Sequence, residues 1–205
     1  MNLSDFYYTL PKHLIAQSAL HPRDSCRLMV LQSGGIEHRK FYEIIDYIKP
    51  GDVLVLNETK VTPSKLIGRK ATGGKVEVIL TKRLSRSKEL YQARIRGNRI
   101  KQNILLIFKH NLAEIVGQEN DIFYLKFKKK LSRQGLIIPT PPYIRQRVPE
   151  KDYQTVFAGK STSRSLAAPT AGLHFTPQLL RKLQKAGIQT VKLRLHIGFG
   201  TFLPI

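Results

Sequence analysis

The apolar positions of the first sixty residues follow the spacings of an α/β segment. Residues 27–31 and 36–38 read as two short strands joined by a Gly34-Gly35 turn. The next apolar residues recur at i, i+3, i+4 and i+7, which predicts an amphipathic helix over Lys40–Ile48 with one face made of Phe41, Ile44, Ile45 and Ile48. After that helix, the continuous apolar run Val53–Leu56 is typical of a strand that is covered on both faces.

The spacing changes to a period of two between Ser64 and about Lys130. Apolar and polar residues alternate at positions 76–81, 91–96 and 123–128, and residues 118–121 read as a turn. Several short strands at close spacing indicate a small antiparallel β-barrel. Arginines and lysines on the outward positions fit a nucleic-acid-binding barrel and, equally, a basic exterior that only meets solvent.

The last part of the chain returns to an α/β pattern. Leu136–Pro149 is Pro-rich and extended, which suits a crossing back from the barrel. Thr176 is a good N-cap for a helix over Pro177 to about Lys185, Gly187 is its expected stop, and Gln189–Ile197 reads as a strand. We therefore expect an α/β domain built from both ends of the chain, residues 1–63 and 150–205, with a β-barrel domain inserted at residues 64–149.

The net charge of the chain adds the strongest indication of a binding partner. The 205 residues include 35 Lys and Arg against 14 Asp and Glu, a net charge of +21. Between Lys60 and Pro149 there are 21 basic and 5 acidic residues, so +16 of that charge lies in one segment. A solvated lysine-rich surface is one explanation, and a polyanionic partner, above all a nucleic acid, is the interpretation that the concentration of charge favours.

Composition excludes several other classes. No apolar run approaches the roughly 20 residues that span a bilayer, and the N-terminus lacks the apolar core of a signal peptide. The single Cys26 excludes an internal disulfide and fits a reducing compartment, so we expect a cytoplasmic protein with no membrane partner. The six histidines show no ligand spacing, so no metal site is predicted.

Two histidines are candidates for chemistry. His174 lies in the loop AAPTAGLHFT (167–176), whose small apolar residues suggest either a lined pocket at the start of a helix or plain packing. His196 is followed by the turn GFGT, in which Gly198 and Gly200 would allow the backbone to approach a ligand closely. His174 is the better candidate because its neighbours in the loop carry no other titratable group.

Polar residues at two other places are also candidates. Asn57-Glu58-Thr59 follows the most apolar strand, where ligands bind in open α/β sheets, although a polar turn explains these residues as well. Asp24 lies between Arg23 and Arg27, as part of a structural ion pair or of a site that grips a charged substrate.

Several longer sequence motifs, here called words, occur in one order along the chain and together show a resemblance that single residues do not show. They are RDSCRL (23–28), PGDVLVLNET (50–59), TGGKVEV (72–78), PPYI (141–144), YQTVFA (153–158), the AAPTAGLHFT loop and LHIGFGTFLP (195–204). With these words the chain resembles the S-adenosylmethionine:tRNA ribosyltransferase-isomerases of queuosine biosynthesis over essentially its whole length.

The resemblance implies an activity and its partners. The family transfers and isomerises the ribosyl moiety of S-adenosylmethionine onto 7-aminomethyl-7-deazaguanine at the wobble position of the tRNA anticodon, which gives epoxyqueuosine. S-adenosylmethionine would be the co-substrate, the anticodon stem-loop the macromolecular partner, and the protein a monomer without a metal. His174 or His196 would be the general base.

The same resemblance implies two sets of binding residues. Substrate binding is expected at Arg23, Asp24, Arg27, Asn57, Thr59, Pro169, Thr170, Gly172, Phe175, Gly198, Gly200 and Thr201. Binding of tRNA is expected at Lys75, Arg94, Arg96 and Tyr143.

The sequence departs from the family at its end. Family members continue beyond the LHIGFGTFLP word into a further α/β segment, whereas this sequence stops at Ile205. Three alternatives stay open at this point: the transferase, a truncated RNA-binding homologue without catalysis, and an enzyme assembled from two chains.

Overall fold

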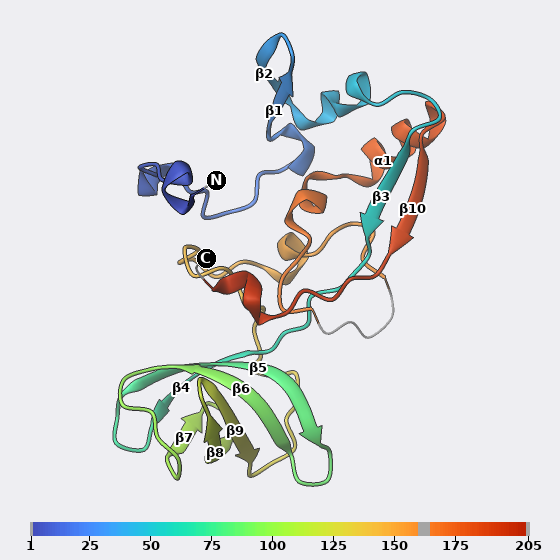
Figure 1. Cartoon of the computed structure of the whole chain (residues 1–205). Helices are drawn as coiled ribbons and strands as arrows, with labels where there is room; N and C mark the ends of the chain where they lie inside the picture. The colour runs from blue at the N-terminus through green and yellow to red at the C-terminus, as the bar shows by residue number, and fades with distance from the viewer. Residues whose placement is uncertain (1, 160–164, 204–205) are drawn as a thin grey trace.

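The chain folds into a barrel and a second body that is made from both of its ends. The computed structural model describes residues 2–159 and 165–203. Figure 1 shows the barrel below and all other labelled elements above it, with the two linking segments side by side between the bodies. The expected fold class, an α/β unit with an inserted antiparallel β-barrel, is confirmed.

Six antiparallel strands close the barrel in the order β4-β5-β6-β9-β8-β7. They are β4 (Lys65–Lys70), β5 (Lys75–Ser85), β6 (Leu90–Arg96), β7 (Leu105–Phe108), β8 (Leu112–Glu119) and β9 (Ile122–Phe127). The period of two places one side chain in two inside, so that Val76, Val78 and Leu80 are buried as the pattern predicts. At the closing β4–β7 pair, a Cβ on Gly68 would lie 2.6 Å from the carbonyl oxygen of Ile107, so only glycine permits this approach.

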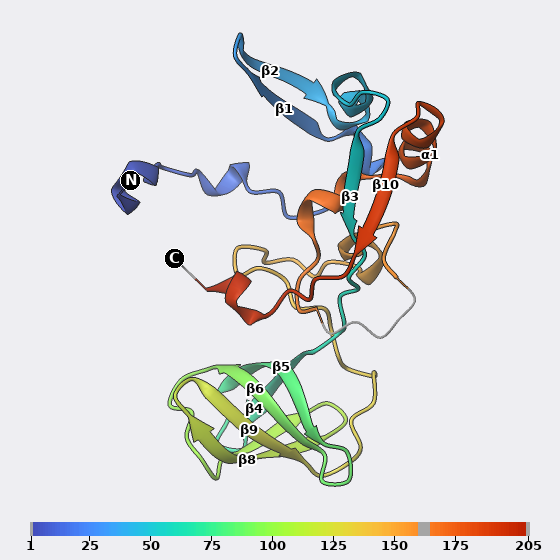
Figure 2. The same ribbon diagram turned by 45° about the vertical axis from the view of Figure 1, so that its right-hand side comes forward.

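The upper body joins the two ends of the chain through a parallel strand pair. β3 (Val53–Asn57) pairs with β10 (Gln189–Leu193), and α1 (Pro177–Lys185) precedes β10 as predicted. Figure 2 shows β3 and β10 side by side with α1 next to them, and the hairpin of β1 (Arg27–Gln32) and β2 (Gly35–Lys40) projecting away. The core between these elements consists of Phe41, Leu56, Phe157, Phe175, Leu179, Leu183 and Ile188.

The remaining helical segments are short 3-10 turns. They are η1 (Leu3–Phe6), η2 (Lys12–Leu14), η3 (Arg23–Ser25), η4 (Phe41–Tyr47), η5 (Glu150–Tyr153), η6 (Thr170–His174) and η7 (Phe199–Phe202). Among the described residues, no helix is both long and apolar enough to cross a membrane.

The prediction of an amphipathic α-helix at residues 40–48 is wrong about the type of helix, but the predicted apolar face is the one that packs into the core. The segment is the 3-10 helix η4, with Phe41 in the core and Ile44, Ile45 and Ile48 packed against it. Aromatic and β-branched residues have little α-helical propensity, and a short segment cannot recover it through many backbone bonds. The apolar face therefore still packs against the core, while the backbone adopts the tighter 3-10 conformation.

The expectation that β3 is covered on both faces is also wrong. Leu56 is buried, but Val53 and Val55 are 51% and 56% exposed, and Val191 on β10 is 50% exposed. In the described part of the chain this sheet has two strands, and α1 and η4 pack on one of its faces. Within the described residues nothing covers the other face of the sheet. The apolar run Val53–Leu56 is therefore buried on one face and exposed on the other.

The strand expected to reach Ile197 ends at Leu193. Beyond that point the side chain of Asn57 takes the place of a strand partner: its Nδ2 donates to the carbonyl of Leu195 at 3.0 Å, and its Oδ1 accepts from the Leu195 amide at 3.1 Å. A side-chain amide can satisfy one residue in this way but cannot continue a ladder.

Candidate functional site

The side chain of His174 contacts residues from the N-terminal part of the chain. It ends η6, and its Nδ1 lies 3.0 Å from the Sγ of Cys26, 148 positions earlier in the sequence. The ring of Phe41 lies against the imidazole, with 5.2 Å between ring centroids. From the sequence, Cys26 was used only to exclude a disulfide and to indicate a reducing compartment, and was not a candidate site residue, although it lies inside the RDSCRL word.

Burial sets the protonation of this pair. Burial, together with the positive charge of Arg23, lowers the pKa of His174. Burial also raises the pKa of the Cys26 thiol, and the charge of Asp24 acts in the same direction. Both shifts favour a neutral imidazole beside a neutral thiol over a thiolate–imidazolium pair.

Asp24 connects the same N-terminal word to the start of α1. Its carboxylate accepts a hydrogen bond of 2.6 Å from the hydroxyl of Thr176. The Thr176 oxygen in turn accepts from the amide of Leu179 at 3.1 Å, as an N-cap does. Among the described residues Asp24 makes no ion pair with Arg23 or Arg27, so the structural ion pair that was one reading of the sequence is wrong.

The two arginines of that word differ in their environments. Arg23 donates to the carbonyl of Gln154 at 2.9 Å and to that of Lys151 at 3.1 Å, so its guanidinium ties η3 to η5. Arg27 is exposed at the start of β1. Of the two, only Arg27 presents an exposed side chain to a ligand.

The apolar loop before α1 is packed on one side. Phe175 is buried against Phe41 and Phe157, and a Cβ on Gly172 would lie 2.7 Å from the ring of Phe157. Pro169 is half-buried and Thr170 is exposed. Some residues of the loop thus pack into the core, and His174 lies half-buried near its end.

A second cluster surrounds His196. The Oγ1 of buried Thr59 lies 2.7 Å from the Oγ of Ser165 and 3.3 Å from the Nδ1 of His196. The Ser165 hydroxyl also accepts from the amide of Ile197 at 2.8 Å. Asn57 accepts from the amide of Thr59 as well, so both polar residues at the end of β3 hold the 195–197 segment in place. His196 itself is exposed.

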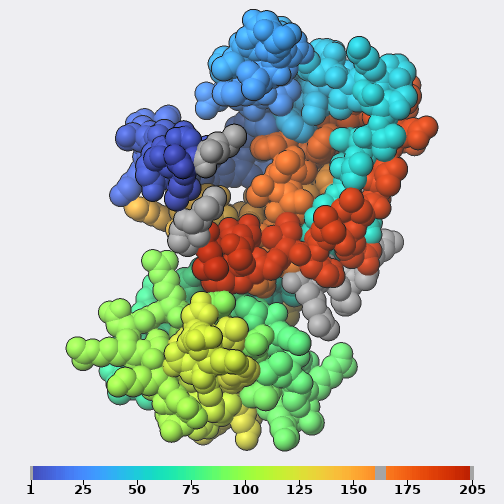
Figure 3. Space-filling view, viewed as in Figure 1, coloured from blue at the N-terminus to red at the C-terminus, as the bar shows by residue number. Residues whose placement is uncertain are grey.

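The GFGT turn meets the barrel. Phe199 receives the guanidinium of Arg94, 5.0 Å from its ring centroid, and Arg94 is ion-paired with Asp121. These residues and Arg96 line a cavity of about 500 Å³ between the outer barrel wall and η7. Figure 3 shows the C-terminal residues in red at the junction of the two bodies.

The other expected contact residues lie outside this cavity. Gly198 and Gly200 have open space where a Cβ would be, and Thr201 is exposed. Lys75 is exposed at the start of β5. Tyr143 is 56% exposed on the crossing segment, and its carbonyl accepts from Gln17 at 3.2 Å. The end of the LHIGFGTFLP word, at position 204, lies outside the described residues.

Comparison with known proteins decides the family. A family model described as queuosine biosynthesis protein matches residues 3–205. This chain belongs to that queuosine biosynthesis family. The resemblance that the sequence words carry is therefore confirmed.

Relatives in the queuosine family are longer than this chain. It is 45% identical over 215 residues to an S-adenosylmethionine:tRNA ribosyltransferase-isomerase of Thermotoga petrophila, covering 100% of this chain and 62% of the relative. A protein of the same name from a Sulfurihydrogenibium species is 44% identical over 217 residues, with 63% of its length covered. A solved S-adenosylmethionine tRNA ribosyltransferase of Thermotoga maritima is 35% identical, with a TM-score of 0.39 and coverage of 94% of this chain and 58% of that one.

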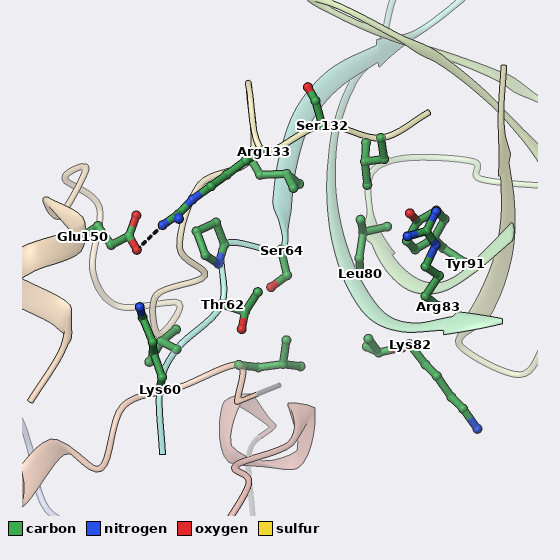
Figure 4. A pocket seen from close by; sticks show the side chains of 16 residues that line it. Lys60, Thr62, Ser64, Leu80, Lys82, Arg83, Tyr91, Ser132, Arg133 and Glu150 are labelled. Atoms are coloured by element: carbon green, nitrogen blue, oxygen red, sulfur yellow. Dashed lines mark hydrogen bonds and ion pairs between the residues drawn. The ribbon is translucent and has the colours of Figure 1, made fainter. Parts of the chain in front are cut away.

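One feature of this queuosine-family chain was missed by sequence reasoning. A cavity of about 530 Å³ lies where the barrel meets the upper body, and its lining includes Lys60, Ser64, Lys82, Arg83 and Arg133 (Figure 4). The only signal in the sequence was the excess of basic residues after position 60. Among the described residues no three His, Cys, Asp or Glu side chains gather as a metal site.

Proposed function

We propose that this chain carries the substrate-binding and base-catalysis part of an S-adenosylmethionine:tRNA ribosyltransferase-isomerase. The observation that carries the proposal is the 45% identity, over the whole chain, to a relative of that name. The reaction would move the ribosyl moiety of S-adenosylmethionine to 7-aminomethyl-7-deazaguanine at the wobble position of tRNA and give epoxyqueuosine.

His174 is the residue we propose as the general base. The positive sulfonium of S-adenosylmethionine acidifies the neighbouring C5′ hydrogens, so a neutral imidazole can remove one as a proton and leave an ylide. Burial keeps His174 neutral by lowering its pKa. If Nδ1 carries the ring hydrogen and donates to Cys26 Sγ, the lone pair of Nε2 is left to accept the substrate proton.

The following steps need positioning more than further acid–base groups. The ylide expels adenine, which takes up the proton held by His174 as it leaves, so that His174 is neutral again. The primary amine of the deazaguanine then attacks the sugar fragment, and closure of the epoxide breaks the carbon–sulfur bond and releases methionine. The amine must lose a proton in its attack, and His174 returned to its neutral form can accept that proton. His196 is exposed and lies beside Thr59, so it is better suited to positioning than to base catalysis.

The test is release of adenine from S-adenosylmethionine in the presence of tRNA that carries the deazaguanine precursor. It uses this chain alone and a chimera that adds the part of the Thermotoga petrophila relative outside the matched residues. We expect release in the chimera that requires both substrates. A folded chimera that binds both substrates and releases no adenine would overturn the proposal.

A further inference from the structure

The cavity between the barrel and the upper body has the features of a built site. Its lining comes from the linker after β3, from β5 and β6, and from residues 131–136 and Glu150 (Figure 4). Its volume of about 530 Å³ lies within the range of about 300–1,000 Å³ that is common for ligand pockets. None of the residues singled out in the sequence as contacts for substrate or tRNA lines it.

Ser64 supplies a buried polar atom that no described residue of the chain satisfies. The residue is 7% exposed, and its Oγ is buried and has no hydrogen-bond partner among the described residues. Its backbone is already used, because the amide donates to Ile137 at 3.0 Å and the carbonyl accepts from Leu80 at 2.8 Å. Figure 4 shows Ser64 within the lining, between Thr62 and Leu80. A buried hydroxyl without a partner is costly, and a ligand in the cavity would satisfy it.

The charge of the lining selects an anion. Arg133 is ion-paired with Glu150, and Arg83 with Glu89. Lys60 and Lys82 also line the cavity and make no ion pair within the described residues. Both ammonium groups are therefore uncompensated, and Figure 4 shows Lys60 among the lining residues and Lys82 extending outward from the rim of the cavity. S-adenosylmethionine carries a sulfonium and an ammonium against one carboxylate, so its net positive charge is repelled here.

The walls behind these charges are apolar. Leu80 and Leu166 are buried, and Leu131 and Leu136 complete a leucine-lined side of the cavity. Tyr91 adds a ring whose face is covered by Arg83, 5.3 Å from its centroid. An anion with a flat, weakly polar part fits this combination, and a nucleotide has that chemistry.

We propose that this cavity binds one unpaired nucleotide of the RNA substrate. The base lies along the leucines, its polar edge bonds to the Ser64 hydroxyl, and Lys60 and Lys82 neutralise the phosphates on either side. The proposal rests on the proposed function, which supplies RNA as the partner. RNA is favoured over a free nucleotide because +16 of the chain's charge lies between Lys60 and Pro149, where it can meet further phosphates.

Binding of a fluorescent anticodon stem-loop RNA, followed by anisotropy, tests the assignment without any catalysis. We expect Lys60→Glu and Lys82→Glu each to weaken binding by at least about tenfold. The matched control is Lys126→Glu, which makes the same charge change at an exposed position of β9 outside the cavity lining and should cost less than about threefold. Equal losses in all three variants would overturn the site.

Ser64→Ala separates binding from folding. Removal of an unpartnered buried hydroxyl should leave Tm unchanged or raise it, while RNA affinity falls by about three- to tenfold. Unchanged affinity would overturn the role of Ser64. A lower Tm would show that the hydroxyl is satisfied within the protein and would also contradict the proposal.

Two further arms identify the ligand. A duplex RNA of equal length should show no dependence on Ser64, because its bases are not available. If guanosine monophosphate binds in a Ser64-dependent way while RNA binding ignores Ser64, the cavity is a free-nucleotide site and the proposal is wrong. Adenine release that persists in such variants would leave the proposed function standing.

Discussion

The Sγ of Cys26 lies 3.0 Å from the Nδ1 of His174, across 148 positions of sequence. This contact joins the RDSCRL word to the AAPTAGLHFT loop and places an imidazole with a lowered pKa beside a thiol with a raised one. A neutral, oriented histidine at this place supports its proposed role as a base.

Replacement of His174 by Gln should remove the base and leave the fold. In the chimera described above, we expect single-turnover adenine release to fall by about 10²–10⁴-fold, the usual contribution of general base catalysis. Tm should change little because the imidazole is only half-buried. If instead Tm falls and the rate per folded molecule is kept, His174 is a packing residue.

Stability should depend on pH through the same residue. Its folded pKa is lowered, mainly by burial, so below the unfolded value of about 6.5 the unfolded chain binds more protons than the folded one. The contribution of His174 to the free energy of unfolding is therefore complete above that value and is lost as the pH falls below it. Urea unfolding of the wild type and of His174→Gln at pH 5 to 8 measures this. A difference between them that does not change with pH would contradict the lowered pKa.

Thr176 should stabilise the chain through two hydrogen bonds. Its oxygen caps α1 and its hydroxyl donates to Asp24, so Thr176→Ala should cost about 0.5–2 kcal/mol in the free energy of unfolding. Thr176→Ser keeps both bonds and should recover most of the loss. Gln178→Ala, at an exposed position of the same helix, is the control and should change little. Equal effects of the Ala substitutions at 176 and 178 would show that the cap is unimportant.

Two glycines of the expected site should behave differently. A Cβ at Gly172 would lie 2.7 Å from the ring of Phe157, whereas at Gly200 it would meet nothing within 4 Å. Gly172→Ala should therefore cost about 1–3 kcal/mol of stability, and Gly200→Ala should leave Tm unchanged. If Gly200 lets the backbone approach a ligand, Gly200→Ala lowers adenine release in the chimera at constant Tm. Loss of Tm in both variants would refute the open environment of Gly200.

RNA binding by the whole chain should be mainly electrostatic. The net charge of +21 predicts that the affinity for tRNA falls by orders of magnitude between about 50 and 200 mM salt, if several phosphates are neutralised. Titrations of unmodified tRNA at several salt concentrations give the slope. A binding constant that does not respond to salt would be incompatible with phosphate contacts as the main source of affinity.

The local sequence alone predicted those elements that depend on neighbouring residues only. The period of two in residues 76–81 leads directly to the buried row of β5, and Thr176 with Pro177 begins α1 where the N-cap rule predicts. The words that identify the family are also local, and they needed no structure to be read.

Tertiary structure decided what depends on distant partners. The apolar segment Phe41–Tyr47 forms a 3-10 helix in the folded chain. Val53 and Val55 stay exposed because their sheet has two strands in the described part of the chain. The partner of His174 and the cavity at Ser64 arise from chain closure over more than a hundred residues and from the meeting of two bodies, respectively. Spacing along the chain carries no information on such contacts, because burial and desolvation depend on which surfaces come together in the folded molecule.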